Sequence, residues 1–333
     1  MIFLMEINKK IIDAILNKIP GHVSMVDFLN DALCISKESV YRRIRGDVAF
    51  TLEDIIKLSS KLNISLDDII YANQNKEIKK QPIIFQSGLD KTFEPQKTFF
   101  NFLTAYAQNL DKLSKHKDVN IMVATNRLMI LTAVSYDHLF RFYYYKWMHQ
   151  TQNNPLDFSL SDVILSDEII TLQEKLKKHA RFGNHTYILD TCFLKNTIRE
   201  IRYYYKRQLI SNNDMILIQN DLHKFLDVMV FILSPKIEKE NYSNCIYLSE
   251  NQVESSGLYC KYGDEQMISL WISYGISIMS QNPRICSSYY SWFNSLKKYS
   301  SLISGCNQVL QMKFINRQRD YIENIMNKDL FYE

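Results

Sequence analysis

Glycine and proline are scarce in this chain: its 333 residues include eight glycines and six prolines, against 21 tyrosines and 18 phenylalanines. An all-β sandwich or barrel needs turn residues at short intervals, so this composition argues against that class and favours helices. Hydrophobic residues make up 46% of the chain and charged residues 23%, as in ordinary globular proteins. The length allows two domains, each with its own core.

Recognisable catalytic and metal-binding patterns are also missing. The six cysteines are scattered, with no CxxC pair and no Cys/His cluster at metal-ligand spacing, so we expect reduced thiols and no metal site. Glycine-rich phosphate loops, HExxH and GxSxG are absent. We therefore expect a protein that is not an enzyme and needs no cofactor. An enzyme within residues 99–333 would require titratable side chains clustered in a pocket.

Long hydrophobic runs are lacking as well. The most apolar stretches, 121–134 and 267–279, are too short or too interrupted to cross a bilayer. The opening MIFLMEINKK has neither the leading positive charge nor the long apolar core of a signal peptide. These features predict a cytoplasmic protein with no membrane partner.

Capping residues and hydrophobic spacing predict five short helices within about the first 70 residues. Isoleucines recur every four residues from Ile7 to Ile19, and Pro20-Gly21 follows them. Four residues suited to helix N-caps precede the later helices: Ser24, Ser36, Thr51 and Ser65. Gly46 supplies a left-handed residue after the third helix. The predicted helices are 6–19, 25–33, 37–45, 52–64 and 66–72.

The remainder of the chain is predicted to be a larger helical domain that carries a short sheet. Residues 76–97 are polar, contain prolines, and indicate a linker between domains at 1–75 and 98–333. Segments rich in β-branched and aromatic residues between about 244 and 280 predict a small antiparallel meander. The fold class expected is therefore mainly α. The predicted helices of this domain are 98–115, 119–149, 166–181, 187–211, 213–233, 284–303 and 307–327.

The stretch from Phe28 to Ile70 resembles the lambda-repressor-like helix-turn-helix family, also called the Cro or xenobiotic-response-element type. The resemblance rests on Leu33, the Ile35-Ser36 turn, the inward Val40, Gly46, and the T-L-x-x-I-x-K-L-x-x-x-L-x-I run that begins at Thr51. It covers about 50 to 70 residues. Two positions depart from the family pattern: Asn30 stands where a small residue is usual, and Cys34 where glycine is common.

The resemblance implies that the second motif helix lies in the major groove of DNA. Residues 1–78 hold ten basic and eleven acidic residues, so any positive face must be local. Residues 37–45 contain four basic residues and one acidic residue. Arginine can bind guanine through two hydrogen bonds, and hydroxyls can hold phosphates. The predicted DNA-binding residues are Ser36, Lys37, Glu38, Ser39, Tyr41, Arg42, Arg43 and Arg45.

These features predict a sequence-specific transcription regulator whose partner is double-stranded DNA. Proteins with this motif generally dimerise, so we expect a homodimer assembled by the carboxy-terminal domain, which could also sense a small molecule or a peptide. Two alternatives stay open. The helix-turn-helix could contact a protein partner, and the basic aromatic segment 198–208 could bind nucleic acid or form an ordinary helix with a solvated face.

Overall fold

The structure, a computed structural model, describes parts of residues 8–19 and then residues 24–62, 86–87, 95–151, 154–179, 182–234, 242–254, 256–273 and 276–327. The chain divides into two compact units, Met1–Ile83 and Ile84–Glu333. Each unit is described by itself. The predicted linker, 76–97, includes strand β1 and the first residues of helix α6, and its other residues lie outside the described part.

The described residues of unit 1 include the helices α2 (Met25–Leu33), α3 (Lys37–Arg45) and α4 (Leu52–Leu62). The predicted cap at Ser36 is confirmed, because its side chain accepts a hydrogen bond from the Ser39 amide. Thr51 likewise accepts from the amide of Asp54. Ser24 is the N-cap residue of α2, as predicted, although its side chain accepts no capping hydrogen bond.

The core of unit 1 combines these helices with helical residues from 8 to 16. Ile11 and Ile15 pack with Leu29, Leu33 and Val40 in one hydrophobic cluster. The first helical stretch therefore shares a core with α2 and α3, as its isoleucine spacing predicts. The predicted fifth helix, 66–72, lies outside the described residues.

A left-handed residue sets the turn between α2 and α3. Cys34, at the end of α2, has φ 57° and ψ 43°, a conformation that glycine adopts more readily than other residues. Asn30, the other departure from the family pattern, donates a hydrogen bond to the Ile35 carbonyl oxygen at 2.5 Å. The larger asparagine therefore bridges the turn instead of loosening it.

Unit 2 is built on one eight-stranded mixed sheet with strand order β1-β7-β6-β5-β2-β3-β4-β8. Its centre consists of three parallel strands, β2 (Val119–Thr125), β3 (Gly183–Asp190) and β4 (Tyr242–Ser249). The other strands pair antiparallel with their neighbours. They are β1 (Gln86–Ser87), β5 (Gly257–Tyr262), β6 (Glu265–Ser273), β7 (Ile276–Ser280) and β8 (Ser301–Leu302).

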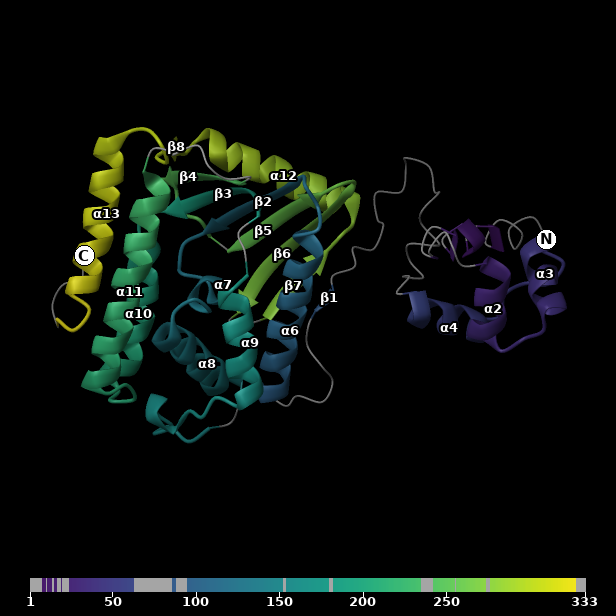
Figure 1. Cartoon of the computed structure of the whole chain (residues 1–333), viewed down its shortest axis with the longest axis horizontal. Coiled ribbons are helices and arrows are strands. Elements are labelled where there is room, and N and C mark those ends of the chain that lie inside the picture. Colours follow the sequence, from purple (N-terminus) through teal and green to yellow (C-terminus); the bar gives the residue numbers. More distant parts are fainter. Residues whose placement is uncertain are drawn as a thin grey trace. The chain divides into compact units, whose positions relative to one another are not determined.

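Helices cover both faces of this sheet unequally (Figure 1). Helix α12 (Pro283–Lys298) packs on β4, β5 and β6 from one side. The other helices form a thick layer on the opposite side. They are α6 (Pro95–Leu113), α7 (Ile130–Ala133), α8 (Asp137–Thr151), α9 (Asp167–Lys177), α10 (Phe193–Lys206), α11 (Asn212–Leu233) and α13 (Gln308–Glu323), with a 3₁₀ turn at Leu160–Asp162.

Strand β2 contributes to a core on each face of the sheet. Met122 and Ala124 pack with Phe293 of α12. Ile121 and Val123 belong to a cluster on the helical side. Because both faces are covered, nearly every residue of β2 is buried, as expected of a central parallel strand.

A buried ion cluster ties the helical layer together. The ammonium group of Lys146 in α8, whose side chain is 2% exposed, pairs with the Glu200 carboxylate of α10. Arg127, which follows β2, binds the same carboxylate at 3.0 Å. Burial lowers the pKa of Lys146 to about 7, against the opposing effect of Glu200. The cluster therefore joins α8, α10 and the segment after β2.

The predicted fold class is wrong. The sheet is large, mixed and central to unit 2, and it is not a small antiparallel meander at 244–280. Strand β2 falls in a segment predicted as a helix, 119–149, and the last four residues of β3 overlap another, 187–211. A strand buried on both faces has a continuous apolar run that periodicity cannot separate from a buried helix. Of the five helices predicted in the first 70 residues, three correspond to α2, α3 and α4, the described residues from 8 to 16 are helical, and the fifth, 66–72, lies outside the described residues.

We expect Cys34→Gly to stabilise the α2–α3 turn. Relief of the left-handed strain raises the free energy of unfolding by roughly 1–2 kcal/mol. The greater conformational freedom of glycine in the unfolded chain lowers it by roughly 0.4–1 kcal/mol. Hydrogen exchange of the α2 and α3 amides in the full chain measures the opening free energy. Cys34→Ala is the matched control, since it keeps the β-carbon. Equal opening free energies for the two variants would contradict this account.

Candidate nucleic-acid interface

Helix α3 is divided into a buried face and an exposed face. Val40 is 0% exposed and Ile44 packs against the same core. Tyr41, Arg42 and Arg45 are exposed on the remaining surface. Ser36, Lys37 and Glu38 are also exposed, while Ser39 and Arg43 are half-buried. Six of the eight predicted DNA-binding residues therefore lie on the surface of unit 1.

Two of the basic side chains on α3 are held by acidic neighbours. The Lys37 ammonium lies 2.6 Å from a carboxylate oxygen of Asp27, and Arg45 Nε lies 3.0 Å from Asp47 Oδ2. The bond with Asp27 raises the pKa of Lys37. Both pairs are largely exposed, and such surface pairs contribute little to stability, so they open easily. Among the described residues, Arg42 has no ion-pair partner.

Arg43 has a different environment from the other arginines of α3. Its Nε donates to Asp54 Oδ2 at 3.0 Å, and the two side chains are 14% and 9% exposed. The same carboxylate oxygen accepts from the Thr51 amide at 2.9 Å, while the Asp54 amide donates to Thr51 Oγ1 at 3.1 Å. Arg43 thus joins α3 to a reciprocal cap at the start of α4. This contact positions α3 and turns the guanidinium away from the exposed face.

The ionisation of Asp54 is coupled to this contact. Burial by itself would raise the pKa of Asp54, but hydrogen bonds from Thr51 and Arg43 to the charged carboxylate outweigh it and hold the pKa below 3.8. The charged form is therefore favoured in the folded state. Its contribution to stability is present above the pKa of an unfolded aspartate, about 3.9, and is lost as the pH falls through the lower folded value.

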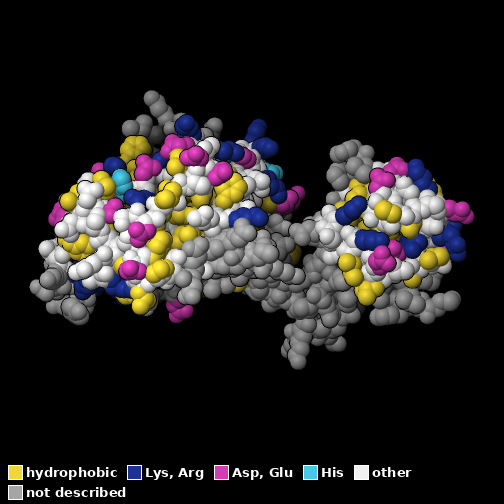
Figure 2. All heavy atoms as spheres, turned by 90° about the horizontal axis from the view of Figure 1, so that it is seen from below, with side chains coloured by type: hydrophobic (Ala, Val, Ile, Leu, Met, Phe, Trp, Pro, Cys, Tyr) yellow, Lys and Arg dark blue, Asp and Glu magenta, His cyan; other side chains and the backbone are white. Residues whose placement is uncertain are grey.

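On the face of unit 1 that Figure 2 shows, basic and acidic side chains are interspersed over the described surface. Helix α3 itself has acidic neighbours in the sequence and in space: Asp27 precedes it, and Asp47 and Asp54 follow it. The exposed face of α3 is therefore a small, locally basic surface surrounded by carboxylates.

Sequence reasoning missed the acidic partners of α3. For Asp54 a signal was present, because Thr51 and Asp54 have the spacing of a capping box. Asp27 and Asp47 carry no comparable signal, since their pairing depends on how α2 and the loop after α3 lie beside α3. Arg43 is among the predicted DNA-binding residues, but in the structure it is half-buried, whereas Arg42 and Arg45 are exposed.

The basic aromatic segment 198–208 forms most of helix α10 and the residues after it. Ile198, Ile201, Arg202 and Tyr204 are buried in the core of unit 2. Arg207 packs over the exposed Tyr203 ring at 5.5 Å. The segment is therefore chiefly a core helix of unit 2.

Comparisons with known proteins identify no family for this chain. No family model matches the sequence, and no curated protein matches it. Among solved structures the chain is similar to TrmBL2, described as an archaeal chromatin protein whose structure shows a novel mode of DNA binding. That similarity has 10% sequence identity and a TM-score of 0.23, and it covers 80% of this chain and 68% of the other. A similarity at this level establishes neither a shared fold nor a shared function.

In the described part of the chain, no helix is both long enough and apolar enough to span a bilayer. The same residues contain no group of three or more histidine, cysteine, aspartate or glutamate side chains arranged to hold a metal ion.

We expect Arg43→Leu to destabilise unit 1 by about 2 kcal/mol at neutral pH, the magnitude of a hydrogen bond to a charged group. The deficit should shrink as the pH falls below about 4, because protonation of Asp54 weakens the same contact in the unsubstituted protein. Urea unfolding followed by far-ultraviolet circular dichroism between pH 7 and pH 3 measures it. Arg42→Leu is the control, and a deficit independent of pH would contradict the role of Asp54.

Proposed function

We propose that unit 1 binds double-stranded DNA through the exposed face of α3, as a helix-turn-helix, and that the chain is a sequence-specific transcription regulator. The observation that carries the proposal is that α3 has one apolar, buried side and one basic, exposed side. Its apolar side is fixed in the core by Val40, and its caps at Ser36 and Gly46 are formed within the chain. The opposite side presents Arg42 and Arg45 from a rigid element. A preorganised helix with outward arginines suits the major groove.

Within this proposal the side chains have different tasks. Arg42, which has no ion-pair partner among the described residues, is ready to bind a base edge or a phosphate. Lys37 and Arg45 exchange their exposed carboxylate partners for phosphate or base contacts. Tyr41, 49% exposed, and the hydroxyls of Ser36 and Ser39 suit phosphate oxygens, and Glu38 suits a cytosine amino group. Arg43 positions α3 through Asp54 and makes no DNA contact.

The proposal includes assembly as a homodimer and no catalytic step. One helix reads only a few base pairs, and dimers of such motifs place two of them in successive major grooves about 34 Å apart. The exposed face of α3 is small and has acidic neighbours, so a single copy has little electrostatic affinity for DNA. Unit 2, with its extensive core, is the part of the chain suited to hold two copies together.

A second candidate function is a contact between unit 1 and a protein partner. One observation favours it: Leu52 and Ile56, one turn apart on α4, are 69% and 55% exposed. Exposed apolar side chains on one helical face are typical of protein interfaces. The two functions differ in their dependence on salt, since only DNA binding releases counterions from phosphates.

We expect the full chain to bind random-sequence duplex DNA at low salt and to lose affinity steeply between 50 and 200 mM salt, with log K falling linearly against log salt. Arg42→Ala should weaken binding by about tenfold or more, the effect of losing roughly 1–3 kcal/mol. Fluorescence anisotropy of a labelled duplex measures both. Arg317→Ala on the exposed side of α13 is the matched control.

Absence of binding even at the lowest salt would overturn the proposal and favour the protein-contact function. If Arg42→Ala and Arg317→Ala bound equally well, α3 would not be the DNA-binding surface. Once a bound sequence is selected from a random pool, the double variant Arg42→Ala/Arg45→Ala should lose preference for it while keeping the circular dichroism spectrum of the unsubstituted protein.

We also expect Asp47→Asn to strengthen DNA binding by a few fold. The substitution releases Arg45 from its carboxylate and removes a negative charge that would lie near phosphates, and both effects act in the same direction. The control is Glu53→Gln, which removes an equal charge from a carboxylate paired with Lys57 of α4 instead of with α3. Anisotropy titrations compare the two variants. Equal gains would attribute the effect to net charge and not to the release of Arg45.

A further inference from the structure

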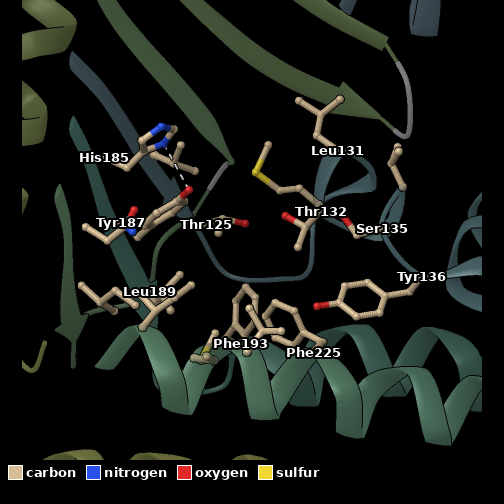
Figure 3. Close-up of a pocket in the computed structure, with 18 of the residues that line it drawn as sticks. Thr125, Leu131, Thr132, Ser135, Tyr136, His185, Tyr187, Leu189, Phe193 and Phe225 are labelled. Atoms are coloured by element: carbon tan, nitrogen blue, oxygen red, sulfur yellow. Dashed lines mark hydrogen bonds between the residues drawn. The ribbon is translucent and has the colours of Figure 1, made fainter. Parts of the chain in front are cut away.

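Unit 2 contains a cavity of about 320 Å³ between the central sheet and the helical layer. Its walls come from α6, α7, α11, and the inward rows of β2, β3 and β4. The strand registers create one of these rows: Val123 of β2 lies opposite Tyr187 of β3, which lies opposite Ile246 of β4. In Figure 3, His185 and Tyr187 border the cavity from β3, and Phe193 and Phe225 border it from the helices. The volume is within the range of roughly 300–1,000 Å³ that is typical of small-molecule sites.

Aromatic rings form one end of the cavity. Tyr136 meets Phe225 edge-on, with ring centroids 6.1 Å apart, and Phe193 lies 5.9 Å from Phe225. Figure 3 shows the hydroxyl end of Tyr136 directed toward the interior. Thr132 and Ser135, on and just after α7, are exposed and mark the side that opens to solvent. A flat apolar molecule therefore has an open entrance and an aromatic wall to pack against.

The charges around the cavity restrict what it can hold. The described residues that line it include no aspartate or glutamate, so a cationic ligand would have no counter-charge. Three basic side chains do line it, and each is already engaged. Arg127 binds Glu200 at 3.0 Å, His179 lies 3.4 Å from Asp111, and His185 contacts the Phe182 carbonyl oxygen at 2.9 Å. Entry of an anion would require one of these contacts to break, because a buried charge needs a partner.

Several polar side chains line the cavity, among them Thr132, Ser135 and Asn244. Tyr106 of α6 also lines it with its ring, and the Tyr106 hydroxyl has no hydrogen-bond partner among the described residues. Burial, with Tyr187 nearby, raises the pKa of Tyr106 to about 12, so the hydroxyl is protonated and can donate. Tyr187 is held by His185, whose Nδ1 lies 3.2 Å from the Tyr187 hydroxyl. Tyr106 is half-buried, and a ligand that displaces solvent from the cavity could satisfy this hydroxyl with an acceptor.

We propose that this cavity is a binding site for an uncharged small molecule that has an apolar, ring-shaped body and one hydrogen-bond acceptor, which receives the proton of Tyr106. The engaged basic groups disfavour anions, and the described lining offers no carboxylate to a cation. The inference concerns unit 2 alone. Its test contains no DNA, so its outcome is independent of the function proposed for unit 1.

Four probes with one skeleton test the ligand class on the full chain by isothermal titration calorimetry. They are 2-acetylnaphthalene, which is neutral with an acceptor, 2-ethylnaphthalene, which is neutral without one, 2-naphthoate, an anion, and 2-naphthylmethylammonium, a cation. We expect saturable 1:1 binding of 2-acetylnaphthalene, with affinity about fivefold lower for 2-ethylnaphthalene, the effect of one neutral hydrogen bond. The two ions should bind roughly tenfold more weakly or not at all, because of desolvation.

Substitutions of residues that line the cavity test whether the probes bind there. Val228→Trp fills the cavity from α11 and should abolish binding, whereas Val230→Trp, on the exposed side of the same helix, should leave it unchanged. Thr132→Trp obstructs the exposed entrance and serves if Val228→Trp fails to fold. Tyr106→Phe should weaken binding of 2-acetylnaphthalene by about fivefold and leave that of 2-ethylnaphthalene within about twofold.

Three results would overturn the proposal: no saturable binding of either neutral probe, equal or tighter binding of an ion, or unchanged affinity in both cavity-blocking variants. If Tyr106→Phe weakened both neutral probes equally, the hydroxyl would not be the donor, and the acceptor part of the proposal would be wrong.

Discussion

The three adjacent parallel strands β2, β3 and β4 are the constraint on which unit 2 depends. Parallel neighbours cannot be joined by hairpins, so each connection must leave the sheet and cross back over one face. Because the strands follow one another in order and such crossovers share one hand, both connections lie on the same face. This explains the thick helical layer on that side, with α12 covering the other. The proposed ligand cavity lies where this layer meets the inward rows of the three strands.

In unit 1, whether a basic side chain of α3 supports packing or is available for binding depends on where its carboxylate partner lies. Arg43 is paired in a half-buried position and supports the packing of α3 on α4. Lys37 and Arg45 are paired on the surface, where exchange for another anion costs little. Four basic residues within nine positions are therefore not equivalent. Under the proposed function, the acidic neighbours reduce attraction to DNA in general and leave recognition to a few well-placed contacts.

Much of the candidate interface could be predicted from the sequence because its determinants are local. The caps at Ser36 and Thr51 and the left-handed Gly46 involve residues within four positions of one another, and the structure has all three. The inward direction of Val40 follows from helical spacing. The burial of Arg43 could not be derived in this way, since its partner lies on another helix, eleven residues along the chain.

For the fold, the sequence by itself determined where α2, α3 and α4 begin and which of their faces are apolar, since capping and 3.6-residue spacing act within a few residues. Tertiary structure alone decided that β2 and β3 are strands. The apolar run of β2 suits a buried helix as well as a strand, and β3, GNHTYILD, mixes polar and apolar residues without clear alternation. Their backbone donors and acceptors are satisfied by pairing between β5, β2, β3 and β4, and the paired residues are far apart in sequence, as Ala124 of β2 and Gly257 of β5 are. Those pairings depend on the whole sheet, which no local window contains.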